Sequence, residues 1–258
     1  MKLTKPRLII LALVLIILFC LRFSLKIRDG FSEKRVEIVV ARYNENLEWL
    51  KAEPFNKYDV IIYNKGDNES FEKPSNVKRG VNLKNVGRES HTYLQHIIQN
   101  YDNLSDITIF LPGSNQMQNK MDMSLKLVKT IEETGNAAFI ANETHENLKT
   151  ALYDFKIDAY QSTNAENKTA NPESKLKESH IRPYGRWFEY TFGDIVASSL
   201  VYCGVFSVAK EDILQHPLEY YKSLETQLST SSNPEVGHYF ERSWTAVFHP
   251  MNKTQIIV

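Results

Sequence analysis

Two polar stretches, distant in the chain, hold the residues best suited to chemistry. The first is Asn85-Val-Gly-Arg-Glu-Ser-His91, which opens an expected helix. The unpaired backbone N–H groups at a helix start favour an anion, and Arg88 is able to hold a diphosphate through two parallel hydrogen bonds. A plain helix start with a solvated arginine explains the same pattern equally well.

The second stretch is Asn233-Pro-Glu-Val-Gly-His-Tyr-Phe-Glu-Arg-Ser-Trp244. His238 and Glu241 are three residues apart and share one face of a helix, where a carboxylate can act as general base on a sugar hydroxyl. Glu235 follows Pro234 at an expected helix start, which favours an ionised and accessible side chain. We therefore expect Glu235 to be the base and Glu241 to form a structural pair with Arg242, so the catalytic candidates are Glu235, His238 and Glu241.

A third stretch, Arg182-Pro-Tyr-Gly-Arg-Trp-Phe-Glu189, places two guanidinium groups beside aromatic rings. Arg186 is accordingly a candidate for a sugar or phosphate surface. A loop packed by cation–π contacts is the alternative, and the pattern slightly favours it.

The elements expected to position these residues alternate between strand and helix. Hydrophobic patterns and breakers predict strands at 36–43, 58–63, 81–86, 106–111, 139–141 and 204–208, and helices at 44–50, 89–100, 121–134, 210–215, 218–228 and 236–248. This order predicts an α/β fold with a mostly parallel sheet flanked by helices. Ligands bind such sheets at the carboxyl ends of the strands, where Arg42, Asn64 and Asp67 stand.

An apolar run precedes this domain. Residues 8–21 are uninterrupted apolar side chains after a basic tip, and no small-residue cleavage site follows them. The run is shorter than the roughly 20 residues of a typical span. We interpret residues 1–7 as a cytosolic tail, 8–25 as an uncleaved signal-anchor transmembrane helix, 26–35 as a stem and 36–258 as the body.

The side of the membrane follows from potential glycosylation sites. More Lys and Arg residues follow the apolar run than precede it, which weighs against a cytosolic N-terminus. Five N-x-[ST] sequons in the body weigh the other way. We expect a single-pass type II protein of the Golgi or endoplasmic reticulum with a lumenal body, glycosylated at Asn68, Asn103, Asn142, Asn167 and Asn252.

Composition and missing motifs exclude several classes of protein. Hydrophobic residues make up 42% of the chain, charged residues 24%, and the net charge is zero, so a nucleic-acid partner is not expected. Cys203 is the only cysteine of the body, which rules out an internal disulfide there. The chain has no P-loop, G-x-S-x-G, H-E-x-x-H or C-x-x-C motif and no Asp-x-Asp, so no metal site is predicted.

Taken in order, the blocks VVARYNENLEWL, IIYNKG, NVGRESHTYLQHIIQNYDNL, ITIFLPG, CGVFSVAKEDILQHPLEYY and NPEVGHYFERSWTAVF resemble the family called domain of unknown function 3431. More distantly, the layout is similar to GT-A-type glycosyltransferases, from which it departs by lacking Asp-x-Asp. This likeness implies a GT-A-like, Rossmann-like fold. It also implies an enzyme that transfers a sugar from a nucleotide-sugar donor to a glycan or protein acceptor. The donor-binding residues it implies are Arg42, Asn64, Asp67, Arg88, Glu89 and Arg186.

Two other functions remain open at this point. The first is a lumenal carbohydrate-binding or scaffold protein that keeps the fold without the transfer reaction. The second is a hydrolase that uses the His and Glu cluster, which lacks a recognisable nucleophile.

Overall fold

The central sheet is built from short strands rich in β-branched residues. Its order is β3-β2-β1-β4-β8. The strands β1 (Val36–Arg42), β2 (Asp59–Asn64), β3 (Val77–Asn82) and β4 (Ile107–Pro112) run parallel, and β8 (Phe206–Ala209) lies antiparallel to β4. The expected α/β fold with a mostly parallel sheet is confirmed.

This computed structural model describes residues 34–158, 175–251 and 255–257. The expected membrane segment, residues 8–25, lies outside these ranges. Within them, no helix is both long enough and apolar enough to cross a membrane.

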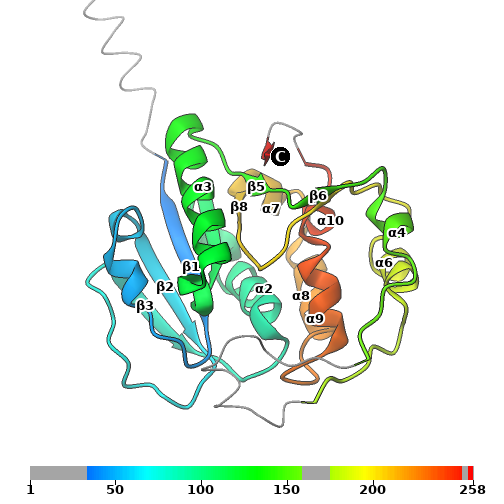
Figure 1. Cartoon of the computed structure of the whole chain (residues 1–258), viewed down its shortest axis with the longest axis horizontal. Helices are drawn as coiled ribbons and strands as arrows, with labels where there is room; N and C mark the ends of the chain where they lie inside the picture. The colour runs from blue at the N-terminus through cyan, green and yellow to red at the C-terminus, as the bar shows by residue number, and fades with distance from the viewer. Residues whose placement is uncertain (1–33, 159–174, 252–254, 258) are drawn as a thin grey trace, which may run out of the picture. The chain divides into compact units, whose positions relative to one another are not determined.

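Each face of the sheet is covered by its own hydrophobic core, because successive side chains of a strand point to opposite faces. Val39 of β1 packs with residues of α2 (Arg88–Asn100), α8 (Leu218–Thr226), α9 (Glu235–Glu241) and α10 (Trp244–Val247). Its neighbours Ile38 and Val40 pack on the other face with α3 (Gln118–Thr134). Figure 1 shows α3 and the group of α2, α8 and α9 as separate layers.

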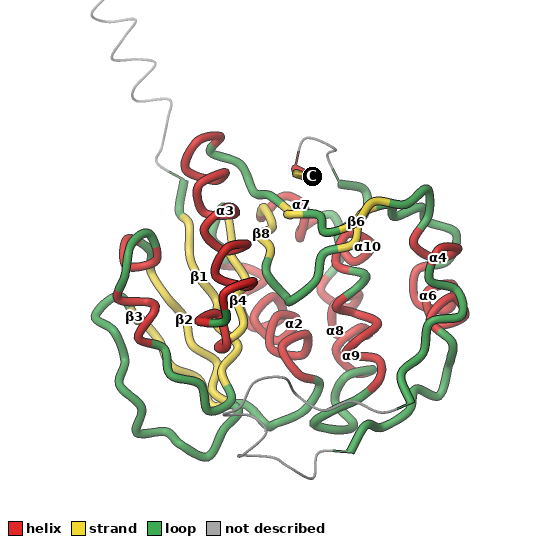
Figure 2. Tube along the Cα trace, in the orientation of Figure 1, coloured by secondary structure: helices red, strands yellow, loops and turns green. Residues whose placement is uncertain are grey.

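Smaller elements complete the domain, as the tube in Figure 2 shows. The short helical turns are η1 (Glu48–Lys51), η2 (Phe55–Lys57), η3 (Tyr101–Asn103), η4 (Gly113–Gln116), α4 (Leu148–Ala151) and α7 (Lys210–Leu214), and α6 (Tyr184–Phe192) is a nine-residue helix. Two small sheets pair β5 (Phe139–Ile140) with β9 (Ile256–Ile257), and β6 (Glu143–Thr144) with β7 (Ser199–Leu200).

Three expected elements differ from the observed ones. The strand predicted at 81–86 forms at Val77–Asn82. The prediction was displaced because β3 is an exposed edge strand, and its residues Lys78, Arg79 and Gly80 show no alternation of apolar and polar side chains. The helix predicted at 44–50 is reduced to the turn η1. The helix predicted at 236–248 is divided into α9 and α10 at Ser243, whose hydroxyl donates to the carbonyl of Tyr239 at 2.9 Å.

The topology brings several chain segments to one edge of the sheet. The parallel strands end there at Arg42, Asn64, Asn82 and Pro112. Because β8 is antiparallel and Phe206 pairs with Phe110 near the end of β4, the turn before β8 reaches the same edge.

Candidate functional site

The start of α2 forms the first part of a charged cluster at this edge. Gly87 has φ 63°, and a Cβ at this position would lie 2.6 Å from the Cβ of His91, so only glycine fits. Arg88 also has a left-handed φ of 54°, which non-glycine residues rarely adopt. The Nη1 atom of Arg88 lies 3.3 Å from Nε2 of His238, and its Nε atom lies 3.6 Å from the carboxylate of Glu89. The cluster thus begins with a strained turn that aims Arg88 toward α9.

The helix α9 forms the second part. His238 Nδ1 lies 4.0 Å from Glu241 Oε2, and Arg242 Nη1 lies 3.7 Å from the same oxygen. Arg242 also donates a hydrogen bond to the carbonyl of His238 at 2.8 Å. The structure therefore brings together Arg88 and Glu89 of one predicted stretch with His238 and Glu241 of the other.

The turn before β8 forms the third part. Cys203 has φ 67°, and its N–H donates to Oε1 of Glu241 at 3.0 Å. Gly204 has φ 64°, and its carbonyl accepts from the hydroxyl of Tyr93 at 2.8 Å. A Cβ on Gly204 would lie 3.1 Å from Cγ of Glu89. The turn consequently packs against both glutamates of the cluster.

The environments of these two carboxyl groups push their pKa values apart. For Glu89, burial favours the neutral form, but the nearby Arg88, Lys120 and Lys65 outweigh it and lower the pKa. For Glu241, burial and the charge of Glu89 raise the pKa and outweigh the opposing arginines. Such separation is typical of carboxyl pairs that divide acid and base roles.

His238 is neutral in this setting. Burial, followed by the charges of Arg88 and Arg242, lowers its pKa to about 2. Because a guanidinium only donates hydrogen bonds, Nε2 of His238 is the acceptor from Arg88, and the ring proton resides on Nδ1. Nδ1 lies 4.0 Å from Oε2 of Glu241, so the imidazole stands between the arginine and the carboxylate without a hydrogen bond to the latter.

Two lysines near the cluster were missed by sequence analysis. Lys65 is buried, and its ammonium donates to the carbonyls of Val86 and Arg88 below the α2 turn. Burial lowers its pKa to about 7, although Glu89 and Glu225 oppose the shift. Lys120 of α3 donates to the hydroxyl of Ser114 at 2.7 Å, and its charge acts on Glu89.

The signals available for these two lysines differ. Lys65 directly follows a strand end, a position where ligands of α/β sheets gather. Lys120 lies on a helix that also has an exposed polar face, so nothing in its sequence marks it.

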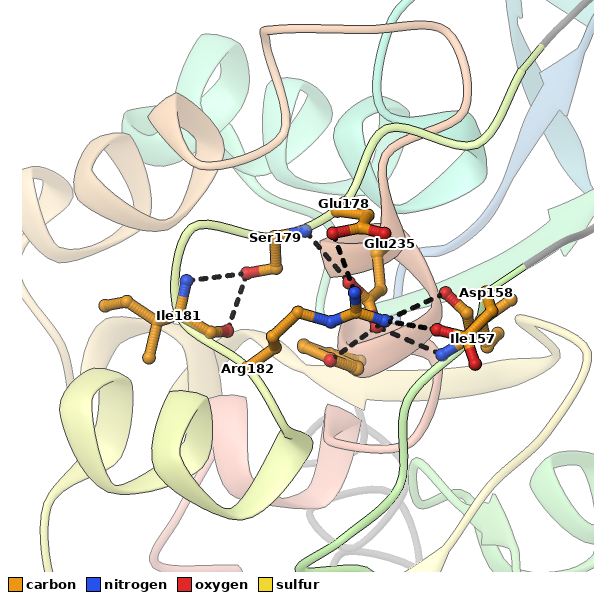
Figure 3. A network of polar contacts seen from close by, with 8 residues as sticks. Ile157, Asp158, Glu178, Ser179, Ile181, Arg182 and Glu235 are labelled. Carbon is orange, nitrogen blue, oxygen red and sulfur yellow. Dashed lines mark hydrogen bonds and ion pairs between the residues drawn. The ribbon is translucent and has the colours of Figure 1, made fainter.

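Glu235 differs from its expected role. Its side chain is 0% exposed, and its carboxylate accepts from the backbone N–H of Ile157 at 3.0 Å and of Ser179 at 2.9 Å. Arg182 and the hydroxyl of Tyr239 also donate to it, at 3.2 and 2.7 Å. Figure 3 shows this carboxylate enclosed by Ile157, Ser179 and Arg182. The prediction that the side chain of Glu235 is accessible is wrong, because the neighbouring chain segments cover the start of α9.

Two of the strand-end candidates are occupied by contacts within the protein. Arg42 is buried and donates to the carbonyls of Glu45 and Asn68 and to Oδ1 of Asn64, at 2.9, 3.0 and 2.6 Å. Its guanidinium also lies 3.8 Å from the ring centre of Phe71. Arg42 and Asn64 therefore hold the loop that follows β2.

The other two donor-binding candidates are exposed. Asp67 lies in the loop after β2, where its charge raises the pKa of Tyr43 after the larger effect of burial. Arg186 lies on α6, which packs on α4. Among the described contacts, none joins Arg186 to the cluster around Arg88.

The described sequons are all at the surface. Asn68, Asn103 and Asn142 are exposed, while Asn167 and Asn252 lie outside the described residues. Asn142 has a second contact, because its Oδ1 accepts from the N–H of Tyr202 at 2.7 Å. Glycosylation would use Nδ2 and leave that acceptor in place.

No group of three or more His, Cys, Asp or Glu side chains with an arrangement suited to a metal ion occurs within the three described ranges. The charges of the cluster are instead mixed, with arginines and lysines beside the glutamates. Such a set can bind an anion and transfer a proton.

Comparisons with known proteins agree with the resemblance seen in the sequence. A family model described as "Protein of unknown function (DUF3431)" matches residues 38–256. The comparison with curated proteins found no match.

Proposed function

The chain belongs to the DUF3431 family of proteins of unknown function, and from that premise we propose that it is a GT-A-like glycosyltransferase. It would transfer a sugar from a nucleotide-sugar donor to a glycan or protein acceptor. The observation that carries this proposal is the pair of glutamates, Glu89 and Glu241, with oppositely shifted pKa values beside Arg88.

In this proposal Glu241 is the general base. Burial, followed by the charge of ionised Glu89, raises the pKa of Glu241 and so makes it a stronger base than an ordinary carboxylate. The side chain of Glu241 is 17% exposed, whereas that of Glu235 is fully enclosed. The N–H of Cys203 fixes one carboxylate oxygen, which leaves the other directed toward His238 and Arg242.

Arg88 is the proposed partner of the donor's diphosphate. It stands at the first turn of α2, where the helix dipole favours negative charge. Lys120 of α3 adds positive charge, and Lys65 beneath the turn adds charge when it is protonated, because its pKa is about 7. Together these groups would stabilise the charge that develops on the leaving diphosphate.

The reaction balances as a displacement. An acceptor hydroxyl gives its proton to Glu241 while its oxygen forms a bond to the anomeric carbon of the donor sugar. The bond between that carbon and the diphosphate oxygen breaks, and the electron pair leaves with the nucleoside diphosphate. The proton is then released from Glu241 to solvent.

Binding of nucleotides to the purified full chain tests the donor site. Isothermal titration with UDP and GDP, each alone and as a sugar conjugate, is expected to identify one that binds. Arg88→Ala should weaken that binding at least tenfold, about 1.4 kcal/mol. It should also lower the melting temperature, because it removes the nearest positive charge from the largely buried carboxylate of Glu89, so binding is measured at a temperature where both proteins are folded. Arg186→Ala is the matched control, because it removes an exposed arginine of the same domain that lies outside the cluster.

The result also separates the proposed enzyme from the carbohydrate-binding alternative. Equal nucleotide binding by the parent and Arg88→Ala would overturn the role of Arg88. Absence of all nucleotide binding, combined with binding of glycans, would replace the transferase with a non-catalytic binding protein.

We also propose that residues 8–25 anchor the chain in the Golgi or endoplasmic reticulum membrane as a type II protein with a lumenal body. The exposure of Asn68, Asn103 and Asn142 supports glycosylation of that body. Glycosidase treatment of membranes should increase gel mobility, and carbonate washing should leave the protein in the pellet. A protease-accessible cytosolic body with unchanged mobility would refute this topology.

A further inference from the structure

An aromatic surface lies directly beside Glu241. The guanidinium carbon of Arg242 is 4.1 Å from the ring centre of Phe155 and 5.1 Å from that of Tyr202. The same guanidinium donates to the carbonyl of His238 and lies 3.7 Å from Glu241. Arg242 is thus held by two rings and α9, while Tyr202 remains partly exposed.

The backbone couples the position of Tyr202 to that of Glu241. The N–H of Tyr202 donates to Oδ1 of Asn142 at 2.7 Å. The N–H of the next residue, Cys203, donates to Oε1 of Glu241 at 3.0 Å. One strained turn therefore carries both the ring and the hydrogen bond that orients the proposed base.

The charges around Tyr202 are balanced. Burial raises the pKa of its hydroxyl, Arg242 lowers it, and Glu143 and Glu241 raise it again. The arginine charge is already shared with Glu241, so the surface offers no surplus positive charge to an acidic ligand. An aromatic face beside fixed polar groups is instead suited to a ligand with an apolar face and many hydroxyls.

We propose that Tyr202 and Arg242 form the acceptor subsite and bind a neutral pyranose of the acceptor glycan. This inference rests on the proposed transferase function, because it takes Glu241 as the base that receives the acceptor proton. The sugar stacks on the ring of Tyr202 and directs one hydroxyl toward Glu241. Asn142 is a positioning residue, since it acts only through the N–H of Tyr202.

Saturation-transfer NMR on the full chain tests the subsite without turnover. The probes are lactose and cellobiose as neutral sugars and glucuronic acid as an acidic one. We expect the parent protein to bind at least one neutral probe and Tyr202→Ala to weaken that binding at least fivefold. Tyr202→Phe should retain binding, because it keeps the ring and removes only the hydroxyl.

Tyr190→Ala is the matched control, because Tyr190 is 71% exposed on α6 and belongs to the same domain. It should leave neutral-sugar binding unchanged. An equal loss in Tyr190→Ala, unchanged binding in Tyr202→Ala, or binding of only glucuronic acid would each overturn the subsite. So would a parent protein that binds neither neutral probe.

Titration of the same samples with UDP and GDP distinguishes the two proposals. Nucleotide binding that depends on Arg88, together with sugar binding that ignores Tyr202, would overturn the subsite alone. If sugar binding depends on Tyr202 but the protein binds no nucleotide, the sugar-binding role of Tyr202 is supported and the proposed transferase function is refuted.

Discussion

The two glutamates of α9 occupy opposite kinds of environment although they belong to one short helix. Glu235, at its first residue, is enclosed and accepts hydrogen bonds from two backbone N–H groups, an arginine and a tyrosine. Glu241, at its last residue, is close enough to Glu89 for the two charges to interact, and Arg88 acts on both, whereas Arg242 acts on Glu241. The carboxylate of Glu235 has all of its hydrogen-bond partners within the protein, whereas Glu241 has a raised pKa.

The difference shows that the position of a carboxylate within a helix can decide whether it stabilises the fold or is suited to catalysis. The start of α9 lies between the chain segments 157–158 and 178–182, whose N–H groups must be satisfied once they are buried. The end of α9 lies at the strand edge, where α2 and the turn before β8 meet it. A buried group with all its partners stabilises a fold, whereas an incompletely compensated one is available for reaction.

The largest expected effect is the loss of transfer in Glu241→Gln. Removing a general base typically slows a reaction by 10²–10⁴-fold, so we expect turnover to fall by about 10³-fold. Folding should be retained, because an amide at this position can still accept from the N–H of Cys203. Turnover with the donor identified by titration, measured together with a melting curve, checks this prediction. A variant that keeps more than a tenth of parental turnover would contradict it.

Glu235→Gln is expected to give the opposite result. The amide accepts fewer hydrogen bonds than the carboxylate, so buried donors among Ile157, Ser179 and Tyr239 lose a partner. An unpaired buried donor costs about 1–3 kcal/mol, and we expect the free energy of unfolding to fall by about 2 kcal/mol or more. Urea unfolding measures it.

The control for this loss is Asp158→Asn, which changes an exposed partner of Arg182 and should have little effect. If Glu235→Gln unfolds at the parental urea concentration, the structural role of Glu235 is wrong. Its turnover, corrected for the folded fraction, should remain close to that of the parent.

The raised pKa of Glu241 predicts a pH dependence of stability. Its folded pKa lies above the ordinary value of 4.5, so the native state binds more protons than the unfolded state above that pH. Stability then falls as the pH rises through the folded pKa. Glu241→Gln removes this loss, so its stability relative to the parent should increase between pH 4.5 and 7.

Glu89→Gln should show the opposite trend. The lowered pKa of Glu89 contributes stability that is present above pH 4.5 and is lost as the pH falls through the folded pKa. Urea unfolding of the parent and both variants at pH 3, 4.5, 5.5 and 7 compares the two slopes, with the effect of Glu89 expected below pH 4.5 and that of Glu241 above it. Parallel slopes for the variants would refute the separation of the two pKa values.

The smallest expected effect concerns the strained turn that holds Glu241. The left-handed φ of Cys203 costs a side-chain-bearing residue roughly 1–2 kcal/mol, which glycine avoids at a smaller cost in unfolded-chain entropy. Cys203→Gly should therefore be more stable than Cys203→Ala by up to about 1 kcal/mol. Both variants lack the thiol, so their difference in urea unfolding isolates the backbone, and a more stable alanine variant would rule out strain.

Much of the fold followed from local patterns. The apolar runs of β1, β2 and β4 predicted three strands of a mostly parallel sheet, and the periodicity of α2 and α3 predicted both helices. That these three strands are neighbours is known only from the structure. The edge strand β3 was displaced in the prediction because its exposed, basic residues lack alternation. Errors in the elements thus arose where local hydrophobicity was weakest.

The candidate site was predicted less completely. Arg88, Glu89, His238 and Glu241 were identified as two separate stretches, and the structure places them together. The roles of Glu235 and Glu241 could not be predicted from their spacing. A helix start has the same sequence pattern whether other chain segments bury it or leave it exposed to solvent. Lys120 was missed because its contribution comes from a different helix.

By itself, the sequence determined family membership, the order of the main strands and helices, and the residue types present at the strand edge. These properties depend on side-chain periodicity and on short motifs, which are local. Only the tertiary structure decided which charges are compensated and which are not. Burial and pKa depend on neighbours more than 100 residues away in the chain, as for Arg88 and His238, and therefore appear only when the chain is folded.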